Sequence, residues 1–166
     1  QVLTSTGAGS PPAFETAAGA DNTPACAVTI SGWFNYSDAT LTKLPFASEI
    51  FDTDSAFDSA TNYRFTVPSG KAGKYYVSAN AQGLGSGYVV RSVGLFLYVN
   101  GSRYTDSTST DINSDANDMS LSTTATLDMA VGDYVEVYII VDVESGYSPK
   151  TYGQSAHLSI FKLAGV

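Results

Sequence analysis

Apolar and polar residues alternate with a period of two through long stretches of this chain. The sequence YYVSAN at 75–80 places an apolar side chain at every second position, and VGLFLYV at 93–99 repeats Val and Leu in the same way. Successive side chains of a β-strand point to opposite faces of a sheet, so this period is typical of strands packed on a core. No stretch has the pattern of a long amphipathic helix.

Turn signals separate the alternating runs. Asn100-Gly101 is a strong hairpin signal, and Gly132-Asp133 reads as a turn through its glycine. Between such turns we predict nine short strands, which together favour a β-sandwich. Their ranges are Ala25–Ile30, Thr40–Leu44, Glu49–Phe51, Tyr63–Val67, Gly73–Ala81, Val90–Val99, Asp118–Leu127, Tyr134–Asp142 and Ser155–Leu163.

The segment from Phe51 to Tyr76 carries a recognisable motif. Its order is Phe51-Asp52, a short loop, Asn62-Tyr63, then Phe65-Thr66-Val67-Pro68, Gly73 and Tyr75. This order resembles the globular head domain of complement first component, subcomponent q, a relative of tumour necrosis factor. The motif of that family reads Phe-Asp, a short loop, Asn-Tyr and F-T-x-P-x-x-G-x-Y-x-F.

Three downstream segments extend the resemblance. LFLYVNG at 95–101 is similar to the family's L-x-x-N-G hairpin, and LDMAVGDYVEV at 127–137 is similar to its L-x-L-x-x-G-D-x-V-x-V. The last strand, SAHLSIFKL at 155–163, is the weakest match, because His157 replaces an aromatic residue and Ser159 a glycine. The resemblance implies an all-β jelly roll of two packed sheets, complement-head/tumour-necrosis-factor-like, that assembles as a homotrimer.

The residues themselves agree with assembly. Strands 90–99 and 134–143 are apolar or aromatic on both faces, as expected where one face meets the core and the other meets a neighbouring subunit. The alternative is a monomer whose outward tyrosines are simply exposed.

Residues 1–23 differ in composition from the rest, being dominated by Gly, Ala, Ser, Thr and Pro. We predict an extended linker there, followed by a jelly-roll knob domain at 24–166. The sequence QVLTSTGAGSPPAFE at 1–15 resembles a segment found ahead of the carboxy-terminal knob in bacteriophage tail-fibre and other virion fibre proteins. Since the chain begins at Gln1 and not Met, we expect it to be a piece of a longer fibre protein. An ordinary tail with no such origin is the alternative.

The composition of the chain limits the kinds of partner that it can bind. The formal net charge is -8 with eight Lys and Arg, so we expect no nucleic-acid partner, because phosphate binding needs clustered basic residues. The sequence has no run of about 18 apolar residues, so we expect no membrane insertion. Cys26 is the only cysteine, which excludes an intrachain disulfide.

Catalytic chemistry is not recognisable. His157 is the only histidine, and a lone histidine supplies neither a triad nor a zinc site, so we expect it to fill the core of the last strand. Cys26 is expected to be a small buried hydrophobic residue. The sequence shows no pair of acidic residues within a recognisable catalytic motif. We predict that the protein is not an enzyme.

The segment from Asp106 to Asp118 is the best candidate for a bound ion. Asp111, Asn113, Asp115 and Asn117 recur at every second position, and Asp118 follows. Calcium prefers six to eight hard oxygens, but Ala116 and Ser122 stand where a helix-loop-helix calcium site needs Gly and Glu. A looser calcium site with ligands Asp111, Asn113, Asp115 and Asp118, or one shared between subunits, is one interpretation. A solvated polar loop is the other, and we favour it.

Three segments are predicted to be loops that carry recognition, at 82–89, 102–118 and 144–153. Tyr88, Tyr104, Tyr147 and Tyr152 lie in them and are the candidate receptor-binding residues, because tyrosine combines apolar area with a hydroxyl group. The alternative is that each tyrosine packs beneath its own loop. Trp33 follows Gly32 and is expected to pack at a loop or an interface.

Together these features favour a non-enzymatic virion structural protein, the trimeric knob of a bacteriophage tail fibre or spike. Its expected partners are other virion fibre or capsid proteins and a host-surface glycan or protein, and its expected location is the virion surface. The alternatives are a capsid-associated head fibre or decoration protein, and a secreted complement-like binding module. An enzyme that degrades surface polysaccharide is disfavoured.

Overall fold

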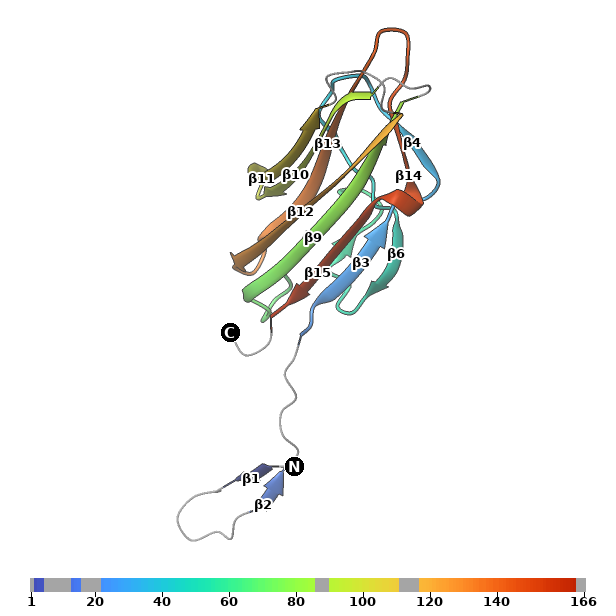
Figure 1. Ribbon diagram of the computed structural model, residues 1–166. Helices are drawn as coiled ribbons and strands as arrows, with labels where there is room; N and C mark the ends of the chain where they lie inside the picture. Colours follow the sequence, from blue (N-terminus) through green and yellow to red (C-terminus); the bar gives the residue numbers. More distant parts are fainter. Residues whose placement is uncertain (1, 5–12, 16–21, 86–89, 111–116, 164–166) are drawn as a thin grey trace.

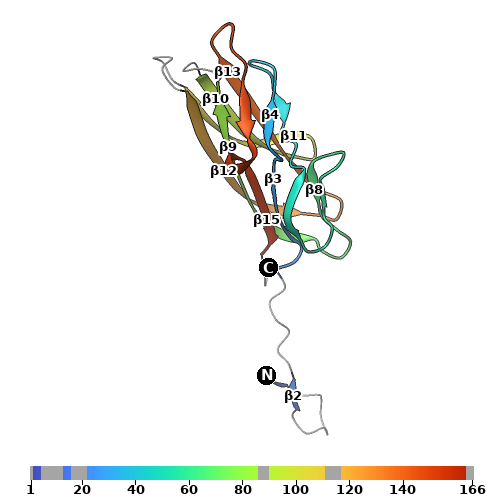
Figure 2. The same ribbon diagram turned by 90° about the vertical axis from the view of Figure 1, so that its right-hand side faces the viewer.

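A computed structural model of the chain describes residues 2–4, 13–15, 22–85, 90–110 and 117–163. Among these residues the strands form a six-stranded sheet, a seven-stranded sheet and a two-stranded hairpin, and all pairings are antiparallel (Figure 1). The two larger sheets pack face to face, as Figure 2 shows from the side. The predicted all-β jelly roll of two sheets is confirmed. No helix in the described part of the chain is long and apolar enough to cross a membrane.

The seven-stranded sheet faces the viewer in Figure 1. Its order is β4-β14-β9-β15-β3-β6, and β12 pairs with the other edge of β9. The short 3-10 turn η1 (Gly153–Ser155) leads into β15. The bounds are β3 (Ala25–Thr29), β4 (Trp33–Asn35), β6 (Ser48–Asp52), β9 (Gly73–Leu84), β12 (Asp118–Met129), β14 (Lys150–Tyr152) and β15 (His157–Lys162).

The six-stranded sheet lies behind it with the order β11-β10-β13-β8-β7, and β5 also pairs with β13. The bounds are β5 (Thr42–Lys43), β7 (Phe57–Asp58), β8 (Arg64–Thr66), β10 (Val90–Val99), β11 (Ser102–Thr110) and β13 (Tyr134–Val143). The hairpin that precedes the jelly roll consists of β1 (Val2–Thr4) and β2 (Ala13–Glu15), which lie within the predicted linker.

The core lies between the sheets and follows the alternation in the sequence. In β13 the odd-numbered residues Val135–Val143 are buried, and in β9 every second residue from Tyr75 is buried. Tyr75 is fully buried against Phe65, with ring centroids 5.6 Å apart. Its hydroxyl donates to the carbonyl of Lys71 at 2.5 Å, so the polar end of this core residue is satisfied.

All nine predicted strands are present within a few residues of their predicted ends, but six short or polar strands were missed. These are β1 and β2 in the predicted linker, and β4, β7, β11 and β14 in the jelly roll. The prediction of a long polar loop at 102–118 was wrong for 102–110, which form β11 on the edge of the six-stranded sheet. An edge strand with a solvated face carries Ser, Thr and Asp without cost, so its sequence lacks the apolar alternation of a buried strand. The predicted loops at 82–89 and 144–153 likewise overlap β9 and β14.

Both predicted turns are present, and they lie side by side. Asn100 and Gly101 have φ values of 51° and 76°, and Gly132 has a φ of 88°. The side-chain amide of Asn100 donates to a carboxylate oxygen of Asp133 at 2.9 Å, and its oxygen accepts from the amide of Tyr134 at 3.0 Å. The β10–β11 hairpin is therefore joined at this end to the turn that leads from β12 in the seven-stranded sheet to β13 in the six-stranded sheet.

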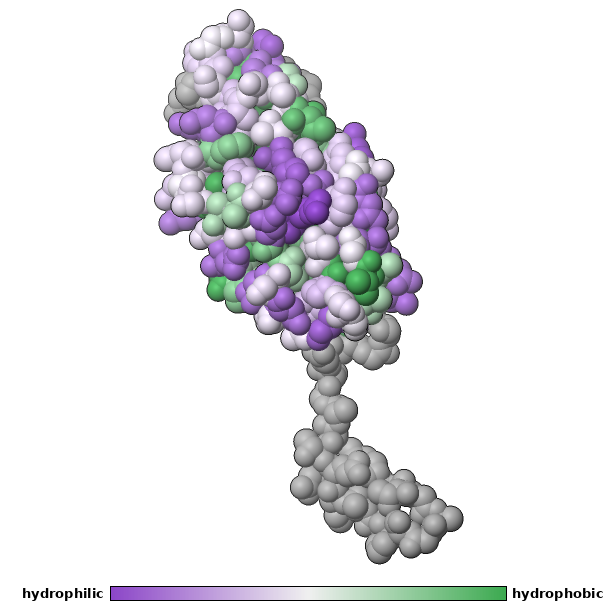
Figure 3. Space-filling view, turned by 180° about the vertical axis from the view of Figure 1, so that it is seen from behind, coloured by the Kyte–Doolittle hydropathy of each residue, from purple (hydrophilic) through white to green (hydrophobic). Residues whose placement is uncertain are grey.

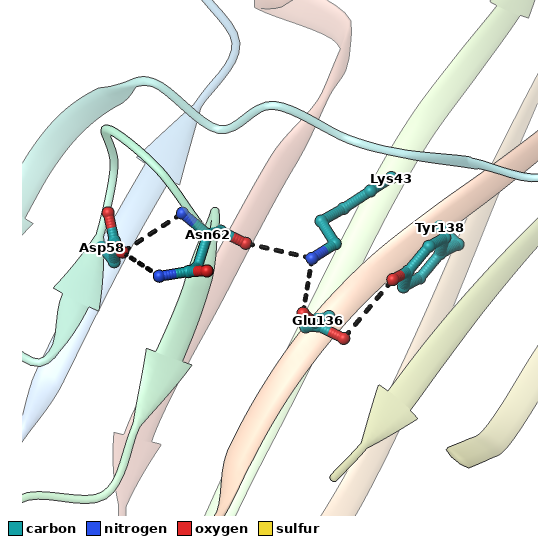
Figure 4. Close-up of polar contacts among 5 residues, drawn as sticks. All are labelled: Lys43, Asp58, Asn62, Glu136 and Tyr138. Atoms are coloured by element: carbon teal, nitrogen blue, oxygen red, sulfur yellow. Dashed lines mark hydrogen bonds and ion pairs between the residues drawn. The ribbon is translucent and has the colours of Figure 1, made fainter. Parts of the chain in front are cut away.

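The family-like motif at 51–63 forms two loops closed by carboxylates. Asp52 accepts a hydrogen bond from the amide of Phe57 at 2.8 Å. Asp58 accepts from the amides of Thr61 at 2.8 Å and Ala60 at 3.1 Å, and from the side chain of Asn62 at 2.6 Å (Figure 4). Donors aimed at the ionised carboxylate favour it, and they lower the pKa of Asp58 to about 2.

This arrangement makes stability depend on pH. Asp58 binds its proton more weakly in the folded protein than in the unfolded chain. Its contribution to the stability of the fold is therefore fully present above its ordinary pKa of 3.8 and is lost as the pH falls through about 2. We therefore expect Asp58→Asn to be less stable than the natural chain at pH 7, with the difference shrinking towards pH 2. Urea unfolding at several pH values measures this, and a difference that stays constant with pH would contradict it.

Candidate binding surfaces

The outward face of the seven-stranded sheet carries an apolar row near the strand ends that lie at the bottom of Figure 1. The row runs across β9, β15, β3 and β6, because the register pairs Tyr76 with Phe161, Phe161 with Ala25, and Ala27 with Phe51. The rings of Tyr76 and Phe161 have centroids 5.3 Å apart. Phe161 is 37% exposed and Phe51 is 49% exposed, so the row is open to contact.

Further along the same face, polar residues replace the apolar ones and two hollows open. The first, here called the serine hollow, has a volume of about 420 Å³. The second, the tyrosine hollow, has about 260 Å³. The serine hollow is lined by Asn80, Ala81, Gln82, Ser120, Leu121, Ser122 and Ser155. The tyrosine hollow is lined by Thr29, Ile30, Gly32, Tyr152, Gly153, Gln154 and His157.

An exposed aromatic group stands beside the tyrosine hollow. Trp33 of β4 pairs with Tyr152 of β14, and their ring centroids are 4.7 Å apart at an interplanar angle of 40°. The ammonium of Lys150 lies 4.6 Å from the centroid of the Trp33 ring. Trp33 remains 56% exposed although it is large and mostly apolar. In the sequence, only the preceding Gly32 drew attention to Trp33, and it did not predict a binding site.

The outward face of the six-stranded sheet, seen in Figure 3, has a different construction: hydrophilic side chains lie over its middle. Cations from the same chain cover the aromatic rings there, with Arg103 at 4.0 Å from the Phe96 ring and Arg64 at 4.3 Å from the Tyr134 ring. Phe96 is only 5% exposed, and its ring also lies against Gly94. The outward apolar residues of β10 that led us to expect a subunit contact are thus already partly covered within the chain.

A polar network on this face holds β5 onto β13 (Figure 4). The Lys43 ammonium donates to Glu136 at 2.5 Å and to the carbonyl of Asn62 at 3.2 Å. Burial disfavours the charged ammonium, but the hydrogen bond and the charge of Glu136 outweigh it, and the pKa of Lys43 is raised. Burial and the nearby Glu136 also raise the pKa of Tyr138. Glu136 is 5% exposed, so this carboxylate depends on its partner.

The predicted receptor-binding tyrosines do not form one patch. Tyr104 is 57% exposed on β11 near the Asn100 turn, and Tyr147 is 42% exposed beyond the far end of β13. The strands between them place these two roughly 20 Å or more apart. Tyr152 is half-buried against Trp33. Tyr88 lies outside the described residues.

The candidate calcium ligands are only partly placed. Asp111, Asn113 and Asp115 lie outside the described residues, and Asp118 is exposed at the start of β12. Asp106, where the candidate segment begins, lies in β11 and pairs with Arg103 at 2.6 Å. No group of three or more His, Cys, Asp and Glu side chains in the described part of the chain is placed to hold a metal.

The two residues considered for catalysis lie in different environments. Cys26 is 1% exposed in the core, as predicted, and burial raises the pKa of its thiol to about 12. Such a thiol is protonated at neutral pH and is a poor nucleophile. The prediction that His157 fills the core was wrong, because it lies on the outward face of β15 and lines the tyrosine hollow. Its neighbour Leu158 takes the core position.

Comparisons with known proteins agree with the fold. No family model and no curated protein matches the sequence. The globular domain of zebrafish complement 1qA protein is 19% identical, with a TM-score of 0.58 over 85% of this chain and 98% of that domain. Eiger TNF from S. frugiperda is 14% identical, with a TM-score of 0.58 over 88% of this chain and 96% of that one. Murine APRIL is 10% identical, with a TM-score of 0.58 over 84% of this chain and 98% of that one. The chain therefore shares the jelly-roll fold of complement head and TNF-like domains.

The Lys43–Glu136 pair yields a stability prediction. Lys43→Met leaves a buried carboxylate without its cation, and we expect the free energy of unfolding to fall by about 1–3 kcal/mol. The double variant Lys43→Met/Glu136→Leu should regain most of this loss, because it removes the orphaned charge as well. Urea unfolding measures both.

Arg91→Met serves as the control, because Arg91 and Glu144 are about half exposed and 3.9 Å apart. Its effect should be within roughly 0–1 kcal/mol. Equal losses for Lys43→Met and for the double variant would show that the charge on Glu136 is not what matters.

Proposed function

We propose that the protein is a non-enzymatic homotrimeric binding module, the knob of a bacteriophage tail fibre or spike, which attaches to a glycan or protein receptor on the host surface. The observation that carries this proposal is the apolar row on the open face of the seven-stranded sheet. Exposed apolar groups that are contiguous across several strands mark a contact surface more often than a free one.

The row suits contact between copies of the chain. Phe161 and Phe51 are exposed and pair in register with the small residues Ala25 and Ala27, so another subunit can approach closely. Aromatic side chains are the residues that subunit interfaces favour at their centre. In a threefold arrangement each copy offers this row to the next, and the ring closes without leaving a row uncovered.

The positions of the chain ends suit a fibre. The amide of Lys162 donates to the carbonyl of Pro24 at 3.1 Å, so the jelly roll begins and ends at the same place, the lower end in Figure 1. A shaft attached through 1–23 would approach from that end. The opposite end, where the connection between β13 and β14 carries Tyr147, would then point away from the virion and towards a host cell.

The assembly can be tested by replacing one residue of the row. We expect light scattering to give three times the chain mass of 17.4 kDa for the natural protein. Phe161→Lys places a charge in the proposed contact, and unpaired buried charges are costly, so this variant should have the mass of a monomer at micromolar concentration.

Tyr104→Lys is the matched control, since Tyr104 is also an exposed aromatic residue but lies on the other sheet. It should remain trimeric. The natural protein running as a monomer, or Phe161→Lys remaining trimeric with its unfolding transition unchanged, would contradict the proposed assembly.

A further inference from the structure

The serine hollow and the tyrosine hollow adjoin on one sheet face. Consecutive residues of η1 divide them, since Gln154 lines the tyrosine hollow and Ser155 the serine hollow. They also meet across the sheet, because His157 of one pairs in register with Asn80 of the other. The two hollows therefore lie side by side on the part of the sheet face that runs from β12 across to β4, and we treat them as one extended site.

The lining of this site is polar but carries no Asp, Glu, Lys or Arg among the described residues. This contrasts with a chain whose formal net charge is -8. Serine and threonine hydroxyls and the amides of Asn and Gln both donate and accept hydrogen bonds. Such a lining matches a ligand that is itself uncharged and rich in hydroxyl groups.

The floor of the tyrosine hollow is tightly built. A side chain on Gly153 would place its Cβ 1.9 Å from the carbonyl oxygen of Ile30, so only glycine allows this approach. The amide of Gly153 donates to the carbonyl of Gly32 at 2.7 Å. The Thr29 hydroxyl lies 2.5 Å from the Gly153 carbonyl and 2.7 Å from that of Ala156. A site fixed in this way loses little entropy when it binds.

Trp33 and Tyr152 add an aromatic wall at the edge of the site. The C–H face of a sugar ring is apolar while its rim carries hydroxyls, and an exposed aromatic ring beside polar groups offers both kinds of contact. The Lys150 ammonium at the Trp33 ring stands at this rim, where it can donate to a ligand hydroxyl.

We propose that this site binds a neutral saccharide, with Trp33 and Tyr152 stacking on a sugar ring and with Gln154, Ser122 and Asn80 binding hydroxyl groups. The inference rests on the proposed function and narrows its receptor to an uncharged glycan. The site begins about 13 Å from the apolar row, because Asn80 lies four residues beyond Tyr76 on β9, so the proposal assigns the contact between subunits to the row and the ligand to the hollows.

The test uses the natural protein and a panel of neutral oligosaccharides of glucose, mannose, galactose and N-acetylglucosamine, with sialylated and uronic-acid oligosaccharides as a charged arm. Trp33 is the only tryptophan in the chain, so its fluorescence reports directly on the wall of the site. We expect at least one neutral oligosaccharide to change this fluorescence saturably at up to millimolar concentration.

Calorimetry with the same saccharide then compares variants. Trp33→Ala should bind about tenfold more weakly or worse, and Gln154→Ala should also lose affinity. Tyr104→Ala, which removes an exposed aromatic residue on the other sheet, should bind as the natural protein does. Trp33 is exposed, so its replacement should leave the unfolding transition unchanged.

The proposal is overturned if no neutral saccharide of the panel binds, if only charged ones bind, or if Trp33→Ala binds equally well. The mass of the natural protein separates this failure from failure of the proposed function. A trimer without saccharide binding would overturn only the saccharide site, whereas a monomer would overturn the assembly whether or not a saccharide binds.

Discussion

The structure depends on one constraint, the burial of every second side chain between two sheets. Strands β9, β10 and β13 each give alternate residues to the same core, and this fixes which residues remain on the two outward faces. A shift of one residue in register would exchange core and surface along a whole strand, so the outward faces are specified as firmly as the core. What covers those outward faces then decides what the protein can bind.

The two faces are covered differently. On the six-stranded sheet, Arg103 and Arg64 lie over aromatic rings, and β5 brings Lys43 onto Glu136, so the chain supplies its own cover. On the seven-stranded sheet the row around Phe161 stays open, and the hollows beyond it have polar walls. This asymmetry is the physical basis for assigning assembly to the lower part of the open face and ligand binding to the upper part.

Local patterns in the sequence predicted the long buried strands and both turns, because these depend on neighbouring residues. They did not predict β11, whose Ser and Thr residues suit an edge strand, or β4 and β14, which are three residues each. Local patterns could not predict the tyrosine hollow, because it depends on a contact between Gly153 and Ile30, which are more than a hundred residues apart in the sequence. The prediction for His157 was wrong for a similar reason. Either His157 or its neighbour Leu158 could have faced the core, and only the pairing of β15 with β9 shows that Leu158 faces the core and His157 faces outward.

The central claim is that copies of the chain cover the lower part of the open face, and thiol labelling tests it most directly. Cys26 is buried, so it contributes little background. Thr126→Cys places a thiol on β12 opposite Tyr76, and Thr108→Cys places one on β11, and both positions are exposed in the single chain. The account predicts that the thiol at 126 reacts more slowly than the thiol at 108 in the concentrated protein, and that dilution to the monomer removes the difference. Equal rates at every concentration would contradict it.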